Sequence, residues 1–232
     1  MKSCNEKMEI LKDIQVEFRL DDICKALRIR TSDDRSRIES LVETAKGLIV
    51  ARAAYKVGYI VAKFDNAVTI DGIQLTSTIL RKNLEEAWRV FLYAVTIGDE
   101  LDEVAKTLDD LLERFWLDFI GNMALSSVQN GLKNLLCSKY ALEQVSSMNP
   151  GSLPDWPIEE QKPLFAILGS TSGAIGVTLT DSLVMKPTKS LSGIFFPTQV
   201  PFYSCQLCSR ESCVGRRAKY RKELAEHYGI EQ

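Results

Sequence analysis

The sequence predicts an α+β fold with one largely antiparallel sheet. Segments with helical periodicity are grouped along the chain, and segments rich in β-branched and aromatic residues form separate clusters. The regular strand–helix–strand alternation of a parallel sheet is absent. The chain has 232 residues, of which 45% are hydrophobic, so it is long enough to bury a sizeable core. No repeat or linker is evident, and we expect a single domain over residues 1–232.

Residues 1–50 are expected to be a helical N-terminal part. A helix should begin after Thr31-Ser32, because Ser32 can cap it and the next two aspartates suit the positive end of the helix dipole. An earlier helix is indicated by apolar positions at helical spacing, which are Ile10, Leu11, Ile14 and Phe18.

A cluster of strands is predicted next. Residues 53–63 are rich in β-branched and aromatic side chains. Asp71-Gly72 separates two short apolar runs and predicts a hairpin with a two-residue turn, since both turn positions need positive φ. Residues 88–97 are apolar on both faces, which indicates a central strand.

Helices dominate the middle of the chain. Ser77 is expected to cap a short helix that runs to Leu84. After Gly98 an acidic helix is expected to about Glu113, and a longer helix from about Phe115 to Leu142. The buried stripe predicted for the longer helix is Leu117, Ile120, Ala124, Val128, Leu132 and Leu135.

The last third is predicted to mix both types of structure. Residues 157–168 can be helical, because proline is accepted in a first helical turn. Residues 179–185 and 191–196 are expected to be two strands joined by a turn at Pro187. A basic helix is expected from about Gly215 to the end of the chain.

Charge excludes some classes of partner. The net charge is −2, with 29 basic and 31 acidic residues, whereas nucleic-acid binders need a basic surface. Residues 99–118 carry a net charge of −6 and residues 210–223 a net charge of +4; each is either a solvated helix face or a partner contact. No apolar stretch suits a membrane span, and the N-terminus lacks the apolar block of a signal peptide. We therefore expect a cytoplasmic protein.

The histidine count limits the chemistry. The only histidine is His227, in a charged C-terminal segment. Ser-His-Asp or Cys-His catalysis and multi-histidine metal sites are therefore not expected. Any chemistry would be carried by a cofactor or by cysteines, and no catalytic residue of the chain's own is predicted.

Three of the six cysteines are clustered as Cys205-x-x-Cys208-x-x-x-x-Cys213, just before the basic helix. Three thiolates at this spacing can hold zinc or an iron–sulfur cluster, although the motif lacks a fourth ligand. The alternative is a set of reduced structural or redox thiols. The other cysteines lie among apolar residues and are candidates for the fourth ligand: Cys4, Cys24 and Cys137.

Three loops contain candidate binding residues. Residues 169–176, Gly-Ser-Thr-Ser-Gly-Ala-Ile-Gly, allow either phosphate binding or a tight turn, and they lack the Gly-Lys-Ser/Thr of a P-loop. Residues 150–157 contain three prolines, a glycine and a tryptophan, which suits a rigid ligand clamp. Residues 186–193 place hydroxyls and a glycine at the start of a strand, as a carboxylate or ribose site or as a solvated hairpin. The candidate ligand-binding residues are Pro150, Gly151, Ser152, Ser190, Ser192 and Gly193.

These loops carry a family resemblance. Residues 185–196, Met-Lys-Pro-Thr-Lys-Ser-Leu-Ser-Gly-Ile-Phe-Phe, resemble the Met-x-Pro-x-x-Ser-Val-Ser-Gly signature of the reactivation domain of cobalamin-dependent methionine synthase. Pro150-Gly151, followed by Asp155-Trp156-Pro157, resembles the Arg-x-x-Pro-Gly-Tyr loop of that family. Thr96-Ile97-Gly98 before an acidic helix is similar to a third segment. The resemblance covers the chain from about Tyr55 onward.

The resemblance implies a C-shaped α+β domain with one long curved antiparallel sheet that binds S-adenosylmethionine. It implies docking on a cobalamin-binding protein whose cobalt is in the inactive Co(II) state. An electron donor such as a flavodoxin or ferredoxin then reduces the cobalt, and S-adenosylmethionine donates the methyl group. The expected function is a free-standing reactivation subunit of methionine synthase, or of a related corrinoid methyltransferase.

Three positions depart from the family pattern. Ser147 stands in place of the family arginine, and Ser152 in place of the tyrosine. A glutamate often present in the long helix of the family falls near Ser126 in this chain. Arginine is the natural partner of a carboxylate, so we expect weak or partner-dependent S-adenosylmethionine binding unless Lys186 or Lys189 takes that role. The alternatives are an iron–sulfur or thiol redox protein that donates electrons to a corrinoid protein, and a docking scaffold that does not bind S-adenosylmethionine.

Overall fold

The computed structural model of the chain describes residues 7–12, 14–210, 212–213 and 216–230. Within them, seven strands form one sheet, in which every neighbouring pair is antiparallel. Its strands are β1 (Glu9–Lys12), β2 (Arg52–Lys63), β3 (Ala67–Ile70), β4 (Ile73–Thr76), β5 (Arg89–Thr96), β6 (Val145–Met148) and β9 (Ser190–Pro197). Their order is β4-β3-β2-β5-β9-β6, and β1 pairs with β2. The α+β prediction with an antiparallel sheet is confirmed.

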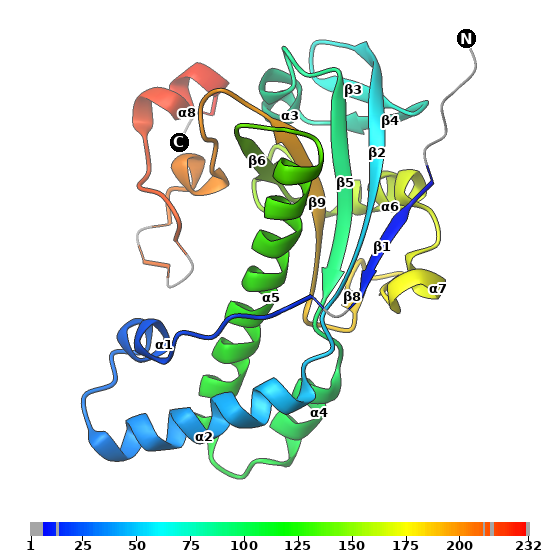
Figure 1. Ribbon diagram of the computed structural model, residues 1–232. Coiled ribbons are helices and arrows are strands. Elements are labelled where there is room, and N and C mark those ends of the chain that lie inside the picture. The colour runs from blue at the N-terminus through cyan, green and yellow to red at the C-terminus, as the bar shows by residue number, and fades with distance from the viewer. Residues whose placement is uncertain (1–6, 13, 211, 214–215, 231–232) are drawn as a thin grey trace.

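Helices cover both faces of the sheet (Figure 1). Helices α1 (Leu20–Ala26), α2 (Ser32–Leu48), α4 (Glu100–Thr107) and α5 (Leu111–Lys139) contribute to the core on one face. Helices α3 (Thr78–Asn83), α6 (Gln161–Leu168), α7 (Thr171–Ile175) and α8 (Lys222–Tyr228) contribute to the core on the other. We call these the α5-side core and the α6-side core; they include Phe91, Tyr93, Leu117 and Ile120, and Leu92, Trp156, Leu164 and Ile194, respectively.

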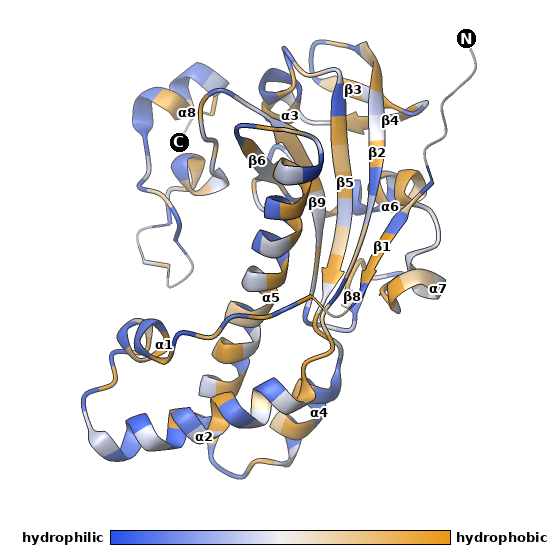
Figure 2. Ribbon diagram, viewed as in Figure 1, coloured by the Kyte–Doolittle hydropathy of each residue, from blue (hydrophilic) through white to orange (hydrophobic). Residues whose placement is uncertain are grey.

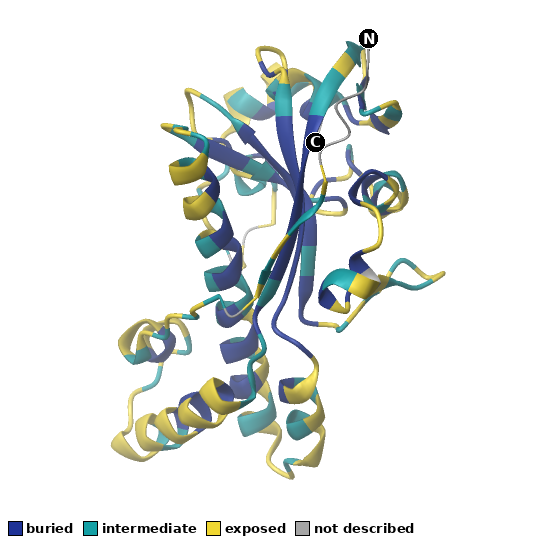
Figure 3. Cartoon of the chain, turned by 45° about the vertical axis from the view of Figure 1, so that its right-hand side comes forward, coloured by how far each residue is buried: buried dark blue, intermediate teal, exposed yellow. Residues whose placement is uncertain are grey.

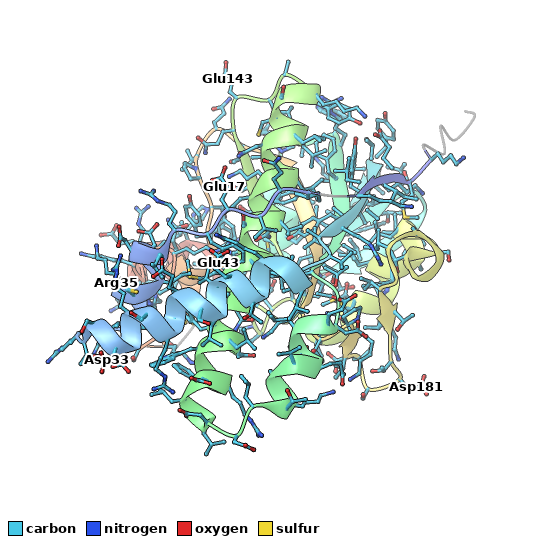
Figure 4. All side chains as sticks on the ribbon, turned by 60° about the horizontal axis from the view of Figure 1, so that its bottom comes forward. Glu17, Asp33, Arg35, Glu43, Glu143 and Asp181 are labelled. Carbon is cyan, nitrogen blue, oxygen red and sulfur yellow. The ribbon has the colours of Figure 1, made fainter. Side chains whose placement is uncertain are left out.

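Burial follows this two-sided packing. Seven of the eight residues of β5 are buried, and Figure 2 and Figure 3 show a hydrophobic, buried strand at the centre of the sheet. Helix α2 instead exposes a charged side, with Asp33, Arg35 and Glu43 on the outside of the molecule (Figure 4). Among the described residues, none of the helices combines the length and apolar character that crossing a bilayer requires.

The predictions from local signals are confirmed. Asp71 and Gly72 have φ angles of 49° and 86° in the β3–β4 turn, as a two-residue hairpin requires. The Ser77 side chain accepts the backbone N–H of Leu80 and caps α3. Strand β5 lies between β2 and β9, the central position predicted for residues 88–97.

The helical prediction for the N-terminal part is wrong at residues 9–12. This segment is β1, which pairs with β2 from Glu9 opposite Tyr55 to Lys12 opposite Arg52. Exposure alternates along β1 with the period of a strand. The cap of α2 is Thr31 rather than Ser32, because the Thr31 hydroxyl accepts the N–H of Asp34 at 3.1 Å.

The boundary between the two central helices also differs from the prediction. Helix α4 ends at Thr107, and α5 begins at Leu111 because the Asp110 carboxylate accepts the N–H of Leu112 at 2.7 Å. The predicted stripe of α5 is buried except for Leu135, which is 37% exposed, and Leu136 is fully buried instead. A helix of 3.6 residues per turn rotates its buried face over such a length.

Two predictions near the C-terminus are wrong. Residues 179–185 are not one strand: β7 (Thr178–Leu179) and β8 (Met185–Lys186) form a short separate ribbon. Its turn is closed by the Thr180 hydroxyl, which contacts both N and O of Val184 at 3.0 Å. The last helix begins at Lys222, and Gly215 lies outside the described residues.

The glycine-rich segment 169–176 forms α7 between Gly169 and Gly176, whose φ angles are 90° and 78°. The buried Thr171 hydroxyl donates to the carbonyl of Val177 at 2.7 Å. This hydroxyl is therefore used in packing, which favours the tight-turn interpretation over phosphate binding.

Candidate functional site

Strand β9 has an open edge over half of its length. It pairs with β5 from Ser190 to Phe195, but β6 covers its other side only from Ile194 to Pro197. Asn149 follows β6 directly, and its side-chain Nδ2 donates to the carbonyl of Ser192 at 2.7 Å. Because the N–H and C=O of one strand residue point to the same side, the N–H of Ser192 also faces this open edge.

A buried tyrosine connects the open edge to α5. The Tyr93 hydroxyl accepts a hydrogen bond from Nε2 of Gln129 and another from Nδ2 of Asn149, each at 2.6 Å. Burial raises the pKa of Tyr93 to about 12, so this phenol stays protonated near neutral pH. It anchors two amide side chains from two different elements.

Gly193 is required for this close approach. A Cβ at this position would lie 2.4 Å from both Asn149 Nδ2 and the carbonyl oxygen of Met148, a distance that side-chain atoms do not tolerate. Gly193 therefore allows β9 to lie close to Met148 and Asn149, at the beginning of the Asn149–Trp156 loop.

Several polar groups of the Asn149–Trp156 loop are paired, which restrains the loop, although the buried indole N–H of Trp156 has no partner in the described structure. The N–H of Gly151, which has a φ of 81°, donates to the Trp156 carbonyl at 2.7 Å. The Ser152 hydroxyl donates to the carbonyl of Asn149 at 2.6 Å. The Asp155 carboxylate accepts the N–H of Thr78 at 3.2 Å and that of Ile79 at 3.0 Å, at the start of α3.

The hydroxyls of the two candidate serines of β9, Ser190 and Ser192, do not point into the open edge of the strand. Side chains alternate along a strand, so Ser190 and Ser192 point away from Tyr93, toward the α6-side core. The Ser190 hydroxyl donates to the carbonyl of Pro187 at 2.7 Å. The Ser192 hydroxyl is buried without a hydrogen-bond partner in the described structure. Their hydroxyls lie off the open edge, and only the backbone of Ser192 faces it.

In the cysteine segment, whose described residues are 204–210, 212–213 and 216–218, one guanidinium contacts several backbone carbonyls. The segment begins with the 3₁₀ turn η2 (Ser204–Leu207), and the N–H of Cys208 donates to the carbonyl of Cys205 at 3.3 Å. Arg216 donates to four backbone carbonyls, those of Cys205, Cys208, Arg210 and Ala218. Cys205 lies within the η2 turn and Cys208 directly follows it, so their backbones are joined by a hydrogen bond.

The metal prediction is not decided by this geometry. Over the described ranges, no three histidine, cysteine or acidic side chains gather as a metal site. Cys205, Cys208 and Cys213 are free thiols, and Cys205 Sγ accepts the N–H of Arg217 at 3.5 Å. Of the possible fourth ligands, Cys24 and Cys137 pack in the α5-side core and Cys4 lies outside the described residues.

The cysteine segment meets the open edge at two points. The hydroxyls of Ser204 and Ser152 are 3.3 Å apart, and Arg217 Nη2 donates to Oε1 of Gln129 at 3.3 Å. Five separate parts of the chain therefore converge: β5, α5, the Asn149–Trp156 loop, β9 and the cysteine segment. We call the following group the β9-edge site: Tyr93, Gln129, Asn149, Ser192, Gly193 and Arg217.

The two lysines considered as substitutes for the family arginine have other partners. Lys189 Nζ contacts the carboxylate of Asp118 and Oδ1 of Asn122 on α5. Lys186 lines a cavity of about 590 Å³ together with Asp99 and Asp102. Among the described residues, neither lysine forms a hydrogen bond with a residue of the β9-edge site.

The sequence did not identify Tyr93, Gln129 or Asn149 as site residues. Asn149 had a usable signal, because it is the polar residue directly before Pro150-Gly151. Gln129 and Tyr93 lie in a helix and a strand that were recognised by their apolar patterns, and no local pattern marks either residue.

The fold is similar to that of a solved protein. It matches the crystal structure of the MetH reactivation domain bound to AdoHcy with a TM-score of 0.56 and 13% sequence identity, over 85% of this chain and 81% of that chain. No protein-family model and no curated protein matches the sequence. At this identity the similarity shows a fold like that of the reactivation domain.

Proposed function

We propose that this chain is a reactivation subunit for a cobalamin-dependent methionine synthase or a related corrinoid methyltransferase. It binds S-adenosylmethionine at the β9-edge site and supports the reductive methylation of Co(II) cobalamin held by its partner. One observation carries the proposal: a restrained Pro-Gly loop meets the open edge of β9 on a fold shared with a domain bound to AdoHcy.

The residues of the site suit binding and orientation rather than proton transfer. The Ser192 N–H and the Asn149–Ser152 backbone would hold the nucleoside, since backbone groups can recognise an adenine without a particular side chain. Tyr93, with its pKa raised to about 12 by burial, does not exchange a proton near neutral pH. S-adenosylmethionine supplies the methyl group, and an external flavodoxin- or ferredoxin-type donor supplies the electron.

The direct test is a methylation assay with the full chain. The Co(II) form of a cobalamin-dependent methionine synthase that lacks its own reactivation domain is mixed with the chain, a reductant and S-adenosylmethionine, and absorbance is followed. We expect methylcobalamin to form only when the chain and S-adenosylmethionine are both present. Equal rates without the chain would contradict the proposal.

A pair of matched variants connects this activity to the site. Asn149→Ala removes the side chain that contacts Tyr93 and Ser192, and we expect it to weaken S-adenosylhomocysteine binding in calorimetry roughly tenfold. Asn130→Ala removes an exposed asparagine of α5 and should leave binding unchanged. Equal effects of the two variants would remove the site from the proposal.

The cysteine segment supports a second candidate function, electron donation to the corrinoid protein. The specific observation is that Cys205 and Cys208 lie in one turn that Arg216 holds. Protein purified without air separates the two forms of this function, because an iron–sulfur protein is brown and a thiol protein is colourless. A chain that binds the corrinoid partner but no S-adenosylmethionine would instead be a docking scaffold.

A further inference from the structure

Two consecutive arginines of the cysteine segment have different environments. Arg216 directs its guanidinium to four backbone carbonyls of its own segment. Arg217 forms one side-chain hydrogen bond in the described structure, to Oε1 of Gln129, and no ion pair there. A guanidinium has five N–H donors in a planar fork, so most donors of Arg217 are available to a ligand.

A chain of hydrogen bonds connects Arg217 to the open edge of β9. Gln129 accepts from Arg217 and donates to the Tyr93 hydroxyl, which also accepts from Asn149. Asn149 in turn donates to the Ser192 carbonyl. The positive charge of Arg217 acts on Tyr93 and lowers its pKa, against the larger effect of burial. Arg217 thus lies at one end of the site, and the edge of β9 that no other strand pairs with lies at the other.

The ligand of the proposed function has matching ends. S-adenosylmethionine and S-adenosylhomocysteine carry a nucleoside at one end and an α-carboxylate at the other. A guanidinium fork binds a carboxylate through two parallel hydrogen bonds. Lys189, one of the two lysines considered for this role, already contacts the Asp118 carboxylate.

We propose that Arg217 binds the α-carboxylate of the ligand, while the Asn149–Ser152 loop and the edge of β9 hold its nucleoside. This assignment rests on the proposed function. It gives the cysteine segment a role in ligand recognition that requires neither a metal nor thiol chemistry.

The test compares two ligands and two variants of the full chain by calorimetry. S-adenosylhomocysteine carries the amino-acid end, whereas 5′-methylthioadenosine keeps the nucleoside and thioether without it. Arg217→Ala removes the proposed carboxylate contact. Lys219→Ala is the matched control, because it removes the same charge from an exposed position two residues away. Thermal melting of each variant confirms that it is folded.

We expect Arg217→Ala to weaken S-adenosylhomocysteine binding roughly ten- to a hundred-fold and to leave 5′-methylthioadenosine binding unchanged. Lys219→Ala should leave both affinities unchanged, and Arg217→Lys should restore only part of the loss, since lysine lacks the fork. Equal losses for both ligands, or equal effects of the two alanine variants, would overturn the assignment. Failure of the unaltered chain to bind either ligand, alone or with its corrinoid partner, would refute the proposed function itself and the assignment with it.

Discussion

The Asn149–Trp156 loop and the cysteine segment face the same site but are stabilised in different ways. The loop is held by several independent contacts: a backbone hydrogen bond across it, the Ser152 hydroxyl, and the Asp155 carboxylate on α3. In the cysteine segment, one side chain, the guanidinium of Arg216, supplies hydrogen bonds to four backbone carbonyls. We expect the loop to keep its shape when one partner is lost, and the cysteine segment to respond most strongly to the loss of Arg216.

The largest effect is expected for Arg216→Ala, which tests how much the cysteine segment relies on this side chain. It removes hydrogen bonds to four carbonyls, of which that of Cys205 still accepts the N–H of Cys208, and each such bond contributes about 1 kcal/mol net. Because the segment is partly exposed, we expect its local stability to fall by only about 2 kcal/mol. Hydrogen exchange of residues 204–218 measures this loss, with Lys219→Ala as the control. Unchanged protection would show that other contacts hold the segment.

A bound metal would be an additional restraint on the cysteine segment, and metal analysis tests for it. If Cys205 and Cys208 hold zinc or iron, protein prepared without air should contain about one equivalent of metal, and Cys208→Ser should lose it together with stability. A metal-free sample whose melting temperature does not change in Cys208→Ser would assign these thiols a purely structural role.

Asp155→Ala tests whether the loop tolerates the loss of one contact. Its carboxylate accepts two N–H groups at the start of α3, and loss of a helix cap costs about 1 kcal/mol. We expect that decrease in the free energy of unfolding, measured in urea, with little change in ligand affinity. Asp65→Ala, at an exposed position, is the control. A complete loss of binding would show that the loop is as dependent on one side chain as the cysteine segment.

The smallest expected effect is a pH dependence from Tyr93. Burial raises its pKa from 10.0 to about 12 in the folded chain, so the unfolded chain loses this proton first as pH rises. Stability should therefore fall between about pH 10 and 12, by about 1.4 kcal/mol per pH unit for this group. Burial also raises the pKa values of Tyr55 and Tyr228, so the measurement is the difference in slope between the natural chain and Tyr93→Phe. Identical slopes would contradict the assignment to Tyr93.

Local signals explain which parts of the structure could be predicted. The Asp71-Gly72 turn and the Ser77 cap are specified by residues that are neighbours in sequence, and both predictions are confirmed. The β1 prediction failed because its partner in β2 lies more than forty residues away, with Glu9 opposite Tyr55. Pairing across that distance outweighs a local helical pattern.

The site was predicted in part for the same reason. Gly193 and the Pro-Gly loop belong to short motifs that the sequence displays. The Arg217–Gln129 contact joins residues 88 positions apart, and the Gln129–Tyr93 contact joins residues 36 positions apart. Only the folded sheet brings a strand, a helix and the cysteine segment together, so no spacing in the sequence indicates them.

The position of β9 in the sheet has a consequence during synthesis. Strand β9 pairs with both β5 and β6, although Ser190 follows its partner Thr96 by 94 residues. At translation rates of about 5–20 residues per second, β5 waits roughly 5–20 s for this neighbour. During that interval an apolar strand has an unsatisfied edge, which is a template for pairing with other chains. Nascent chains should therefore aggregate when synthesis stalls before Pro197, and they should need a chaperone until β9 has emerged.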